Sequence, residues 1–185
     1  MLVLNRRSGE SIIIEPDVRA MVLSIEEGRV WFQLHGLGTV SDLRLSATVV
    51  SVAEARLEIG PLVSVDFDAA GVRLRSAPTS HPAAAMQAGL SISRRVGERV
   101  EIDDEVWIEI GTLPKGNPSV AFGGVGVGEP FTLAVIRPSG SYVRIGVDAP
   151  NRRVYREELW DAVRVTKQDA GAEVPAETLA EAAPG

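Results

Sequence analysis

The sequence predicts a mainly β protein made of two antiparallel β modules, with one short helix near the C-terminus. Val, Ile, Leu and Ala supply most of the apolar content and aromatic residues only 5% of the chain, a composition that favours β structure where Val and Ile alternate with polar residues. The expected strands are joined by two to four residues, which suits antiparallel pairing and is too short for parallel crossovers. The motif Arg-Arg-x-Gly-Glu occurs twice, at residues 6–10 and 94–98. We interpret this repeat as two copies of one module.

The first module is expected to span residues 1–77. Its apolar runs and alternations predict four strands, over residues 1–5, 11–15, 18–25 and 29–34. Residues 46–56 are ambiguous, because Ser46 could cap a short helix whereas three valines within four residues suit a strand. Residues 57–75 predict a hairpin that turns at 69–71. The two prolines and the alanine run of residues 78–88 then indicate a linker.

The second module is expected over residues 89–168. It begins with a strand and a second copy of the motif, and a turn at residues 103–104 leads into a strand at 106–110. The glycine-rich residues 114–130 have no counterpart in the first half, and we interpret them as an inserted loop. A hairpin follows over 131–136 and 142–147, and residues 156–167 predict the helix. Residues 169–185 are acidic and rich in alanine, which is typical of a disordered tail.

Composition excludes several classes of function. The chain has no cysteine, so disulfides, thiolate catalysis and zinc ribbons are excluded, and its two histidines are too few for a His-based metal site. Neither a pairing of nucleophile and base nor a metal-ligand cluster is recognisable, so we predict a protein that is not an enzyme and needs no cofactor or metal. No apolar run is long enough to span a membrane, and the N-terminal charges follow the apolar residues, so we expect a cytoplasmic protein.

The opening and the close of this sequence resemble one protein family. Residues 1–14 (MLVLNRRSGESIII) are similar to the start of the carbon storage regulator (CsrA/RsmA) family of bacterial RNA-binding translational regulators. The second half repeats Arg-Arg-x-Gly-Glu and later carries Val143-Arg-Ile-Gly-Val-Asp-Ala-Pro, followed by Val154-Tyr-Arg-Glu-Glu-Leu. These segments stand in the family's order. The resemblance covers about 34 residues of the first half and about 60 of the second, by direct reading of the sequence.

The resemblance implies a fold and an activity. Family members have five strands and a helix, and two subunits interlock so that the first strand of one lies beside the fifth strand of the other. That seam binds a GGA triplet in an RNA hairpin loop over a ribosome-binding site. The resemblance therefore implies that this chain folds as a monomeric pseudo-dimer, with its two halves in place of two subunits.

Two seams of unequal quality are expected. Single-stranded RNA is bound through base edges and stacking, and arginine supplies both charge and planar donors. In the first seam every position matches the family's residue type, and its predicted RNA-binding residues are Leu4, Arg6, Arg7, Val154, Arg156 and Leu159. The second seam lacks the family's closing pattern, and we predict a weaker site there from Ile92, Arg94, Arg95 and Arg44.

Structural explanations compete with these assignments. Gly9 and Gly97 can serve a turn with positive φ, with Glu10 and Glu98 accepting from main-chain amides, and for these four residues we prefer that interpretation. The paired arginines could lie on a solvated strand face, and Arg156 could pair with an acid of its own helix. The three tryptophans are expected in the core rather than stacked on bases. Residues 122–128 lack the ending of a phosphate-binding loop.

We therefore predict a non-enzymatic RNA-binding regulator that binds a GGA-containing mRNA leader near the ribosome-binding site and represses translation or alters mRNA stability. Hairpin-loop mRNA is the expected partner, with small regulatory RNA as a further candidate. The rival hypothesis is a protein-interaction module with lost or weak RNA binding, which acts as a decoy or as the partner of a flagellar-assembly antagonist. The net charge of −6 favours this rival.

Overall fold

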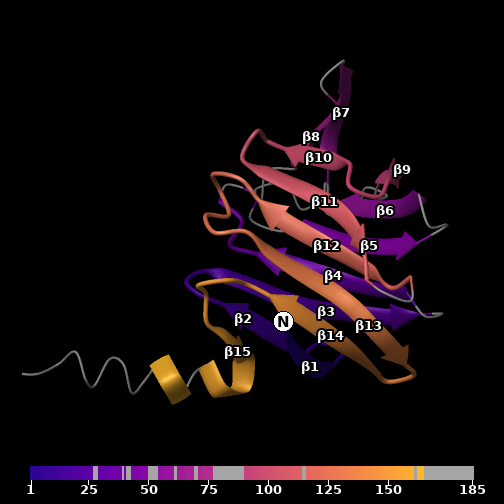
Figure 1. Ribbon diagram of the computed structural model, residues 1–185. Helices are drawn as coiled ribbons and strands as arrows, with labels where there is room; N and C mark the ends of the chain where they lie inside the picture. Colours follow the sequence, from indigo (N-terminus) through magenta and orange to yellow (C-terminus); the bar gives the residue numbers. More distant parts are fainter. Residues whose placement is uncertain are drawn as a thin grey trace, which may run out of the picture.

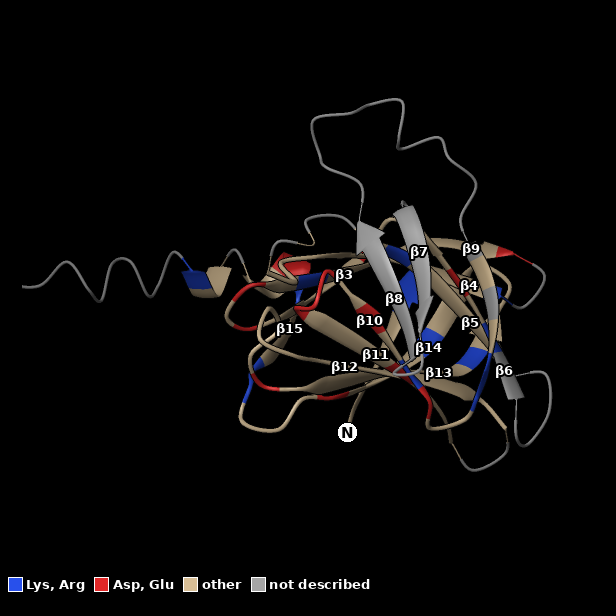
Figure 2. Cartoon of the chain, turned by 90° about the horizontal axis from the view of Figure 1, so that it is seen from above, with Lys and Arg blue, Asp and Glu red and all other residues tan. Residues whose placement is uncertain are grey.

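The computed structural model is a sandwich of two β-sheets, which lie one behind the other in Figure 1 and are seen from above in Figure 2. It describes residues 1–26, 29–38, 40, 43–49, 54–60, 62–68, 71–76, 90–113, 116–160 and 162–164. The larger sheet has eight strands in the order β1 (Leu2–Arg7), β14 (Tyr142–Asp148), β13 (Phe131–Ser139), β12 (Pro118–Gly123), β11 (Val106–Thr112), β10 (Arg99–Ile102), β8 (Gly71–Ser76) and β7 (Leu62–Asp68). The smaller has seven, in the order β15 (Val154–Arg156), β2 (Ser11–Ile14), β3 (Val18–Glu26), β4 (Arg29–His35), β5 (Leu43–Val49), β6 (Glu54–Gly60) and β9 (Leu90–Arg95). The prediction of a mainly β chain is confirmed.

The two halves of the chain exchange their terminal strands. The first strand, β1, pairs antiparallel with β14 of the second half, with Leu2 opposite Val147. The last strand, β15, pairs antiparallel with β2 of the first half, with Val154 opposite Ile14. Neither sheet is therefore built from one half alone, as the pseudo-dimer requires.

The expected partner of the opening strand was wrong in one respect. The sequence comparison placed β1 beside the closing strand, whereas the hydrogen-bonded partner of β1 is β14. The closing strand β15 is instead an edge of the opposite sheet. The two edges still meet across the sandwich, because an ion pair joins Arg6 of β1 to Glu158, which follows β15.

The order of strands repeats between the two sheets. If β1 to β6 are matched to β9 to β14, the order β1-β14-β13-β12-β11-β10 corresponds to β9-β6-β5-β4-β3-β2. The correspondence changes at the closing strand. In the smaller sheet β15 runs antiparallel to β2, whereas in the larger sheet β8 takes the equivalent place and runs parallel to β10. β7 then extends the larger sheet by one more strand.

This correspondence corrects the predicted module contents. Of residues 46–56, which fitted either a helix or a strand, 46–49 belong to β5 and 54–56 to β6, the counterparts of β13 and β14, and 50–53 lie outside the described residues. The predicted insertion over residues 114–130 was wrong in part, because Pro118–Gly123 forms β12, which pairs with β11 and β13 and matches β4. The strand was hidden by the glycines that follow it. Residues 157–160 and 162–164 are helical, whereas the predicted linker 78–88 and tail 169–185 lie outside the described residues.

One hydrophobic core fills the space between the sheets. Inward residues of both sheets belong to a single cluster, among them Ile14, Leu34, Leu57, Ile108 and Ile145. The burial pattern of β4 and β11 alternates with a period of two, as a half-buried strand requires. Phe122 of β12 and Phe131 of β13 are stacked at 4.9 Å between ring centroids and are fully buried. The strand predicted as a loop therefore carries part of the core.

Candidate functional site

The edges of the two sheets come together where β1 and β15 meet, and we call this region the first seam. It consists of β1, β15 and the first turn of the helix at residues 157–160. β1 has a paired neighbour on one side only, and so has β15. Each edge therefore presents main-chain N–H and C=O groups that no sheet partner uses.

Alternate residues of β1 point to opposite sides of its sheet. Leu4 and Arg6 are buried, whereas Asn5 and Arg7 are exposed. The side chain of Arg6 is only 2% exposed, and its Nη1 lies 3.3 Å from Oε1 of Glu158 and 3.7 Å from Oε2 of Glu10. Its Nε and Nη2 are buried with no hydrogen-bond partner. Arg6 thus ties the opening strand to the helix turn and points away from solvent.

The outward side of the first seam is basic. A pocket of about 380 Å³ lies there, lined by Val3, Asn5, Arg137, Tyr142, Arg144 and Arg156. None of these lining residues is acidic, and among the described residues no ion pair engages the three arginines. The acids that follow Arg156 pair elsewhere, since Glu157 lies 2.7 Å from Arg19 and Glu158 pairs with Arg6. Neither of these two acids therefore pairs with Arg156, and Asp161, the third acid that could pair with it, lies outside the described residues.

Sequence reasoning missed three residues of this pocket: Arg137, Tyr142 and Arg144. They come from the hairpin β13–β14, which was used to predict the fold from the sequence but not the RNA site. The signal that could have found them is the alternation along β14, in which Val143 and Ile145 are buried while Tyr142 and Arg144 are exposed. Of the predicted residues, Arg156 lines this pocket, and Leu159 is exposed on the helix turn. Val154 is partly buried and packs against the core.

The Arg-Arg-x-Gly-Glu motif forms the same turn in both halves. Gly9 and Gly97 have φ values of +84° and +90°. The amide of Arg7 donates to Oε2 of Glu10 at 2.9 Å, and in the second copy Arg95 donates to Glu98 at 3.1 Å. The predicted structural role of the glycines and glutamates is confirmed.

The second seam differs in composition and in geometry. β9 pairs with β6 as β1 pairs with β14, so that Arg56 stands opposite Ser93 where Arg144 stands opposite Asn5. Glu54 holds the strand position that Tyr142 holds in the first seam. The structure does not bring Arg44 to this edge, because β6 separates its strand β5 from β9. Ile92, Arg94 and Arg95 do lie on the edge strand.

The tryptophans were expected in the core, but none of the three is fully buried. Trp31, Trp107 and Trp160 are all partly exposed. Trp107 lies under the guanidinium of Arg99, which is 4.1 Å from the ring centroid, and Trp160 packs against Tyr155. Trp160 is near the first seam, whereas Trp107 is on β11, well inside the larger sheet.

Comparison with known protein families supports the resemblance that was read from the first residues of the sequence. Residues 1–35 match the model of the CsrA family, described as a global regulator protein family. The match covers about a fifth of the chain. The matched segment contains β1 to β4, and so the outward face of β1. No curated protein and no solved structure matches the chain.

The described residues lack two features that would indicate other functions. They contain no helix that is long and apolar enough to cross a membrane. They also contain no group of three or more His, Asp or Glu residues that could hold a metal ion. The basic pocket lined by Val3 and Asn5 lies on β1, within the segment that matches the CsrA family.

Proposed function

We propose that this protein is an RNA-binding post-transcriptional regulator that holds a GGA-containing single strand in the first seam. The observation that carries the proposal is the pocket lined by three arginines, Asn5 and Tyr142, without an acid, at the edge of a CsrA-family strand. Binding there to an mRNA leader near the ribosome-binding site would cover that site and repress translation or change the stability of the message.

The chemistry of the pocket suits unpaired RNA. Arginine guanidinium groups can contact phosphates and offer paired donors to guanine, and the exposed ring of Tyr142 can stack on a base. The unpaired edges of β1 and β15 add main-chain donors and acceptors for base edges. In this arrangement Arg7, Arg144 and Arg156 contact RNA. Leu4 and Arg6, which point inward, hold β1 in place, and Leu159 borders the site.

A binding titration tests the proposal. A labelled hairpin with GGA in its loop is titrated at one fixed salt concentration, with a CCA loop as control, since phosphate contacts make affinity depend on salt. We expect the GGA hairpin to bind at least about tenfold tighter, because a lost base contact costs ~1–3 kcal/mol. Arg156→Ala should remove most of this preference. Equal binding of both hairpins, or unchanged binding by Arg156→Ala, would contradict the proposal.

Arg144 and Arg56 provide a matched pair of variants. Both stand opposite the same position of an opening strand, but only Arg144 lines the basic pocket. Arg144→Ala should weaken binding about five- to tenfold, whereas Arg56→Ala should change it less than about twofold. Equal losses would show that general positive charge, rather than the first seam, binds the RNA.

The second seam should contribute a weaker site from Ile92, Arg94 and Arg95. Among the described strands, β8 takes the place there that β15 takes in the first seam, and it runs parallel to β10 rather than antiparallel. We expect a titration to show one hairpin bound tightly per chain and a second bound only at higher RNA concentration. Two equal sites would contradict the inequality of the seams.

The second candidate function is a protein-interaction module, a decoy or partner for a flagellar-assembly antagonist. The net charge of −6 and the burial of Arg6 in an ion pair favour it. The two hypotheses differ in what the purified protein carries. Copurified RNA, seen as a high ratio of absorbance at 260 and 280 nm that falls with added salt, would argue against this candidate.

A further inference from the structure

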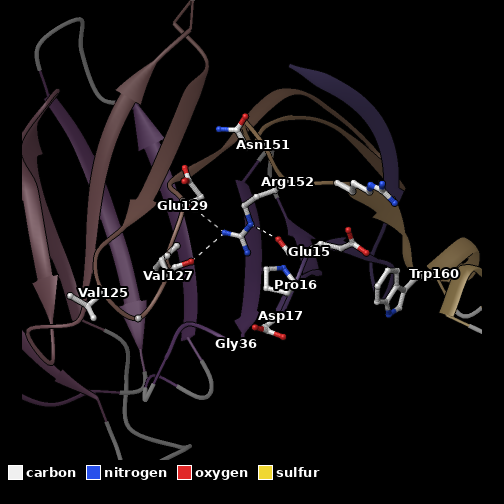
Figure 3. A pocket seen from close by; sticks show the side chains of 13 residues that line it. Glu15, Pro16, Asp17, Gly36, Val125, Val127, Glu129, Asn151, Arg152 and Trp160 are labelled. Atoms are coloured by element: carbon white, nitrogen blue, oxygen red, sulfur yellow. Dashed lines mark hydrogen bonds between the residues drawn. The ribbon is translucent and has the colours of Figure 1, made fainter. Parts of the chain in front are cut away.

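Arg152 occupies an unusual position just before β15. It lies in the loop between β14 and β15, and its guanidinium donates to four main-chain carbonyl oxygens. Figure 3 shows three of the acceptor residues, Glu15, Val127 and Glu129. Nη2 donates to Ile14 at 3.2 Å and Nε to Glu15. Nη1 donates to Glu129 at 2.9 Å and to Val127 at 3.4 Å. One side chain thus joins the end of β2 to the glycine-rich loop before β13.

The environment of Arg152 is that of a structural cross-link rather than a free charge. Burial lowers the pKa of Arg152, although Asp17 and Glu129 act in the opposite direction. Its guanidinium carbon is 5.5 Å from the ring centroid of Phe131. All the acceptors are carbonyl oxygens that bear no formal charge, so the fork geometry of the guanidinium, and not charge alone, suits this site.

The glycine-rich loop is itself fixed to the larger sheet. The amide of Gly126 donates to the carbonyl of Glu105 at 3.0 Å, and the amides of Val127 and Gly128 donate to Gly124 at 3.1 Å. Gly124 has φ +111°, and a Cβ there would lie 2.2 Å from the Glu105 carbonyl oxygen. The loop therefore offers Arg152 two carbonyls from a defined position, against the turn between β10 and β11.

The closing strand needs such an anchor. β15 has only three residues and pairs on one side, so few hydrogen bonds hold it. The amide of Glu15 donates to the carbonyl of Arg153 at 2.9 Å, directly beside the Arg152 contacts. Arg156, which lines the basic pocket, is the last residue of this strand.

We propose that Arg152 is a positioning residue for the first seam: it fastens β15 between β2 and the glycine-rich loop and thereby places Arg156. Arg152 does not contact RNA in this arrangement, and it faces a separate pocket of about 720 Å³. In this arrangement the glycine-rich loop supports the closing strand through Arg152. Its effect on RNA rests on the function proposed above.

The first experiment separates geometry from charge. Arg152→Lys keeps the charge but loses the planar fork, and Arg152→Ala loses both. We expect both variants to bind the GGA hairpin about tenfold more weakly. The melting temperature of the lysine variant should stay within about 4 °C of that of the wild-type protein. Arg99→Ala, which removes an exposed charge from β10 far from this loop, is the control and should bind within about twofold. Full binding by Arg152→Lys would overturn the proposal.

The second experiment approaches the same contact from the loop. Gly124→Ala must displace the loop, because of the clash with Glu105, and leaves every charge in place. If Arg152 acts through the loop, Gly124→Ala and Arg152→Lys should have similar effects, and the double variant should lose no more than either alone. Additive losses would overturn the proposal.

A measurement without RNA keeps the test independent of the proposed function. Amide hydrogen exchange at Tyr155, whose amide faces β2, should become at least about tenfold faster in Arg152→Lys, whereas exchange at Ile145 in β14 should not change. If the wild-type protein does not bind the GGA hairpin, the proposed function is wrong. If exchange in β15 is unchanged in Arg152→Lys, the positioning role of Arg152 is wrong, whatever the RNA result.

Discussion

The buried cation at the first seam allows a direct test of what Arg6 does. We predict that Glu158→Gln destabilises the protein, because it removes the nearest partner of a guanidinium that is 2% exposed and has two nitrogens with no hydrogen-bond partner. Breaking a fully buried ion pair costs ~3–5 kcal/mol, whereas an exposed pair contributes ~0.2–1 kcal/mol. Glu158 is 56% exposed, and Glu10 remains at 3.7 Å, so the cost should fall between these limits, at about 1–2 kcal/mol.

Thermal unfolding gives the measurement. In a domain of this size ~1 kcal/mol shifts the melting temperature by about 2–4 °C, so Glu158→Gln should lower it by about 2–8 °C. Glu157→Gln is the control, because its partner Arg19 is 42% exposed and that pair should contribute less than about 1 kcal/mol.

A second variant tests whether the charge of Arg6 is needed for stability or only its packing. Arg6→Met keeps the length of the side chain and removes the buried charge, so stability should be unchanged or higher. The double variant Arg6→Met/Glu158→Gln should then be as stable as Arg6→Met. The reasoning fails if Glu158→Gln melts at the same temperature as Glu157→Gln, or if Arg6→Met is as unstable as Glu158→Gln.

Three further predictions concern the core, the repeated turn and the second seam. Phe122→Ala should lower the free energy of unfolding by about 3–5 kcal/mol in a urea titration, and a loss below 1 kcal/mol would contradict its place in the core. Gly9→Ala and Gly97→Ala should each cost about 1–2 kcal/mol, because both positions have positive φ, and unequal costs would show that the turns differ. Arg94→Ala/Arg95→Ala should weaken binding of the GGA hairpin less than about twofold, and a tenfold loss in the same titration would place the main site at the second seam.

The sequence predicts the local features of this fold well. The turn of the repeated motif depends on residues within five positions of each other, and both its positive φ values and its glutamate contacts agree with the structure. The hairpin β13–β14 was also predicted, because Pro138 to Gly140 separate two apolar segments. Local chemistry decides such features, so that a single sequence suffices.

Pairings between distant segments could not be predicted in the same way. β12 lies next to a run of glycines, and its burial depends on β11 and β13 rather than on its own composition. β1 pairs with β14, a strand of the other half of the chain. Arg6 contacts Glu158, which is 152 positions away in the sequence, so the local sequence around Arg6 does not predict this contact.

The exchange of terminal strands has a consequence for synthesis on the ribosome. Arg7 pairs with Tyr142, and Ile14 with Val154, so both sheets stay incomplete until nearly the whole chain has left the exit tunnel. At about 5–20 residues per second, the opening strand waits roughly 7–30 s for its neighbour. The first half is therefore expected to be exposed to proteases and chaperones during that interval, and β1 should join its sheet late, because its partner β14 is distant in sequence. Slowing translation of the second half should lower the yield of intact protein.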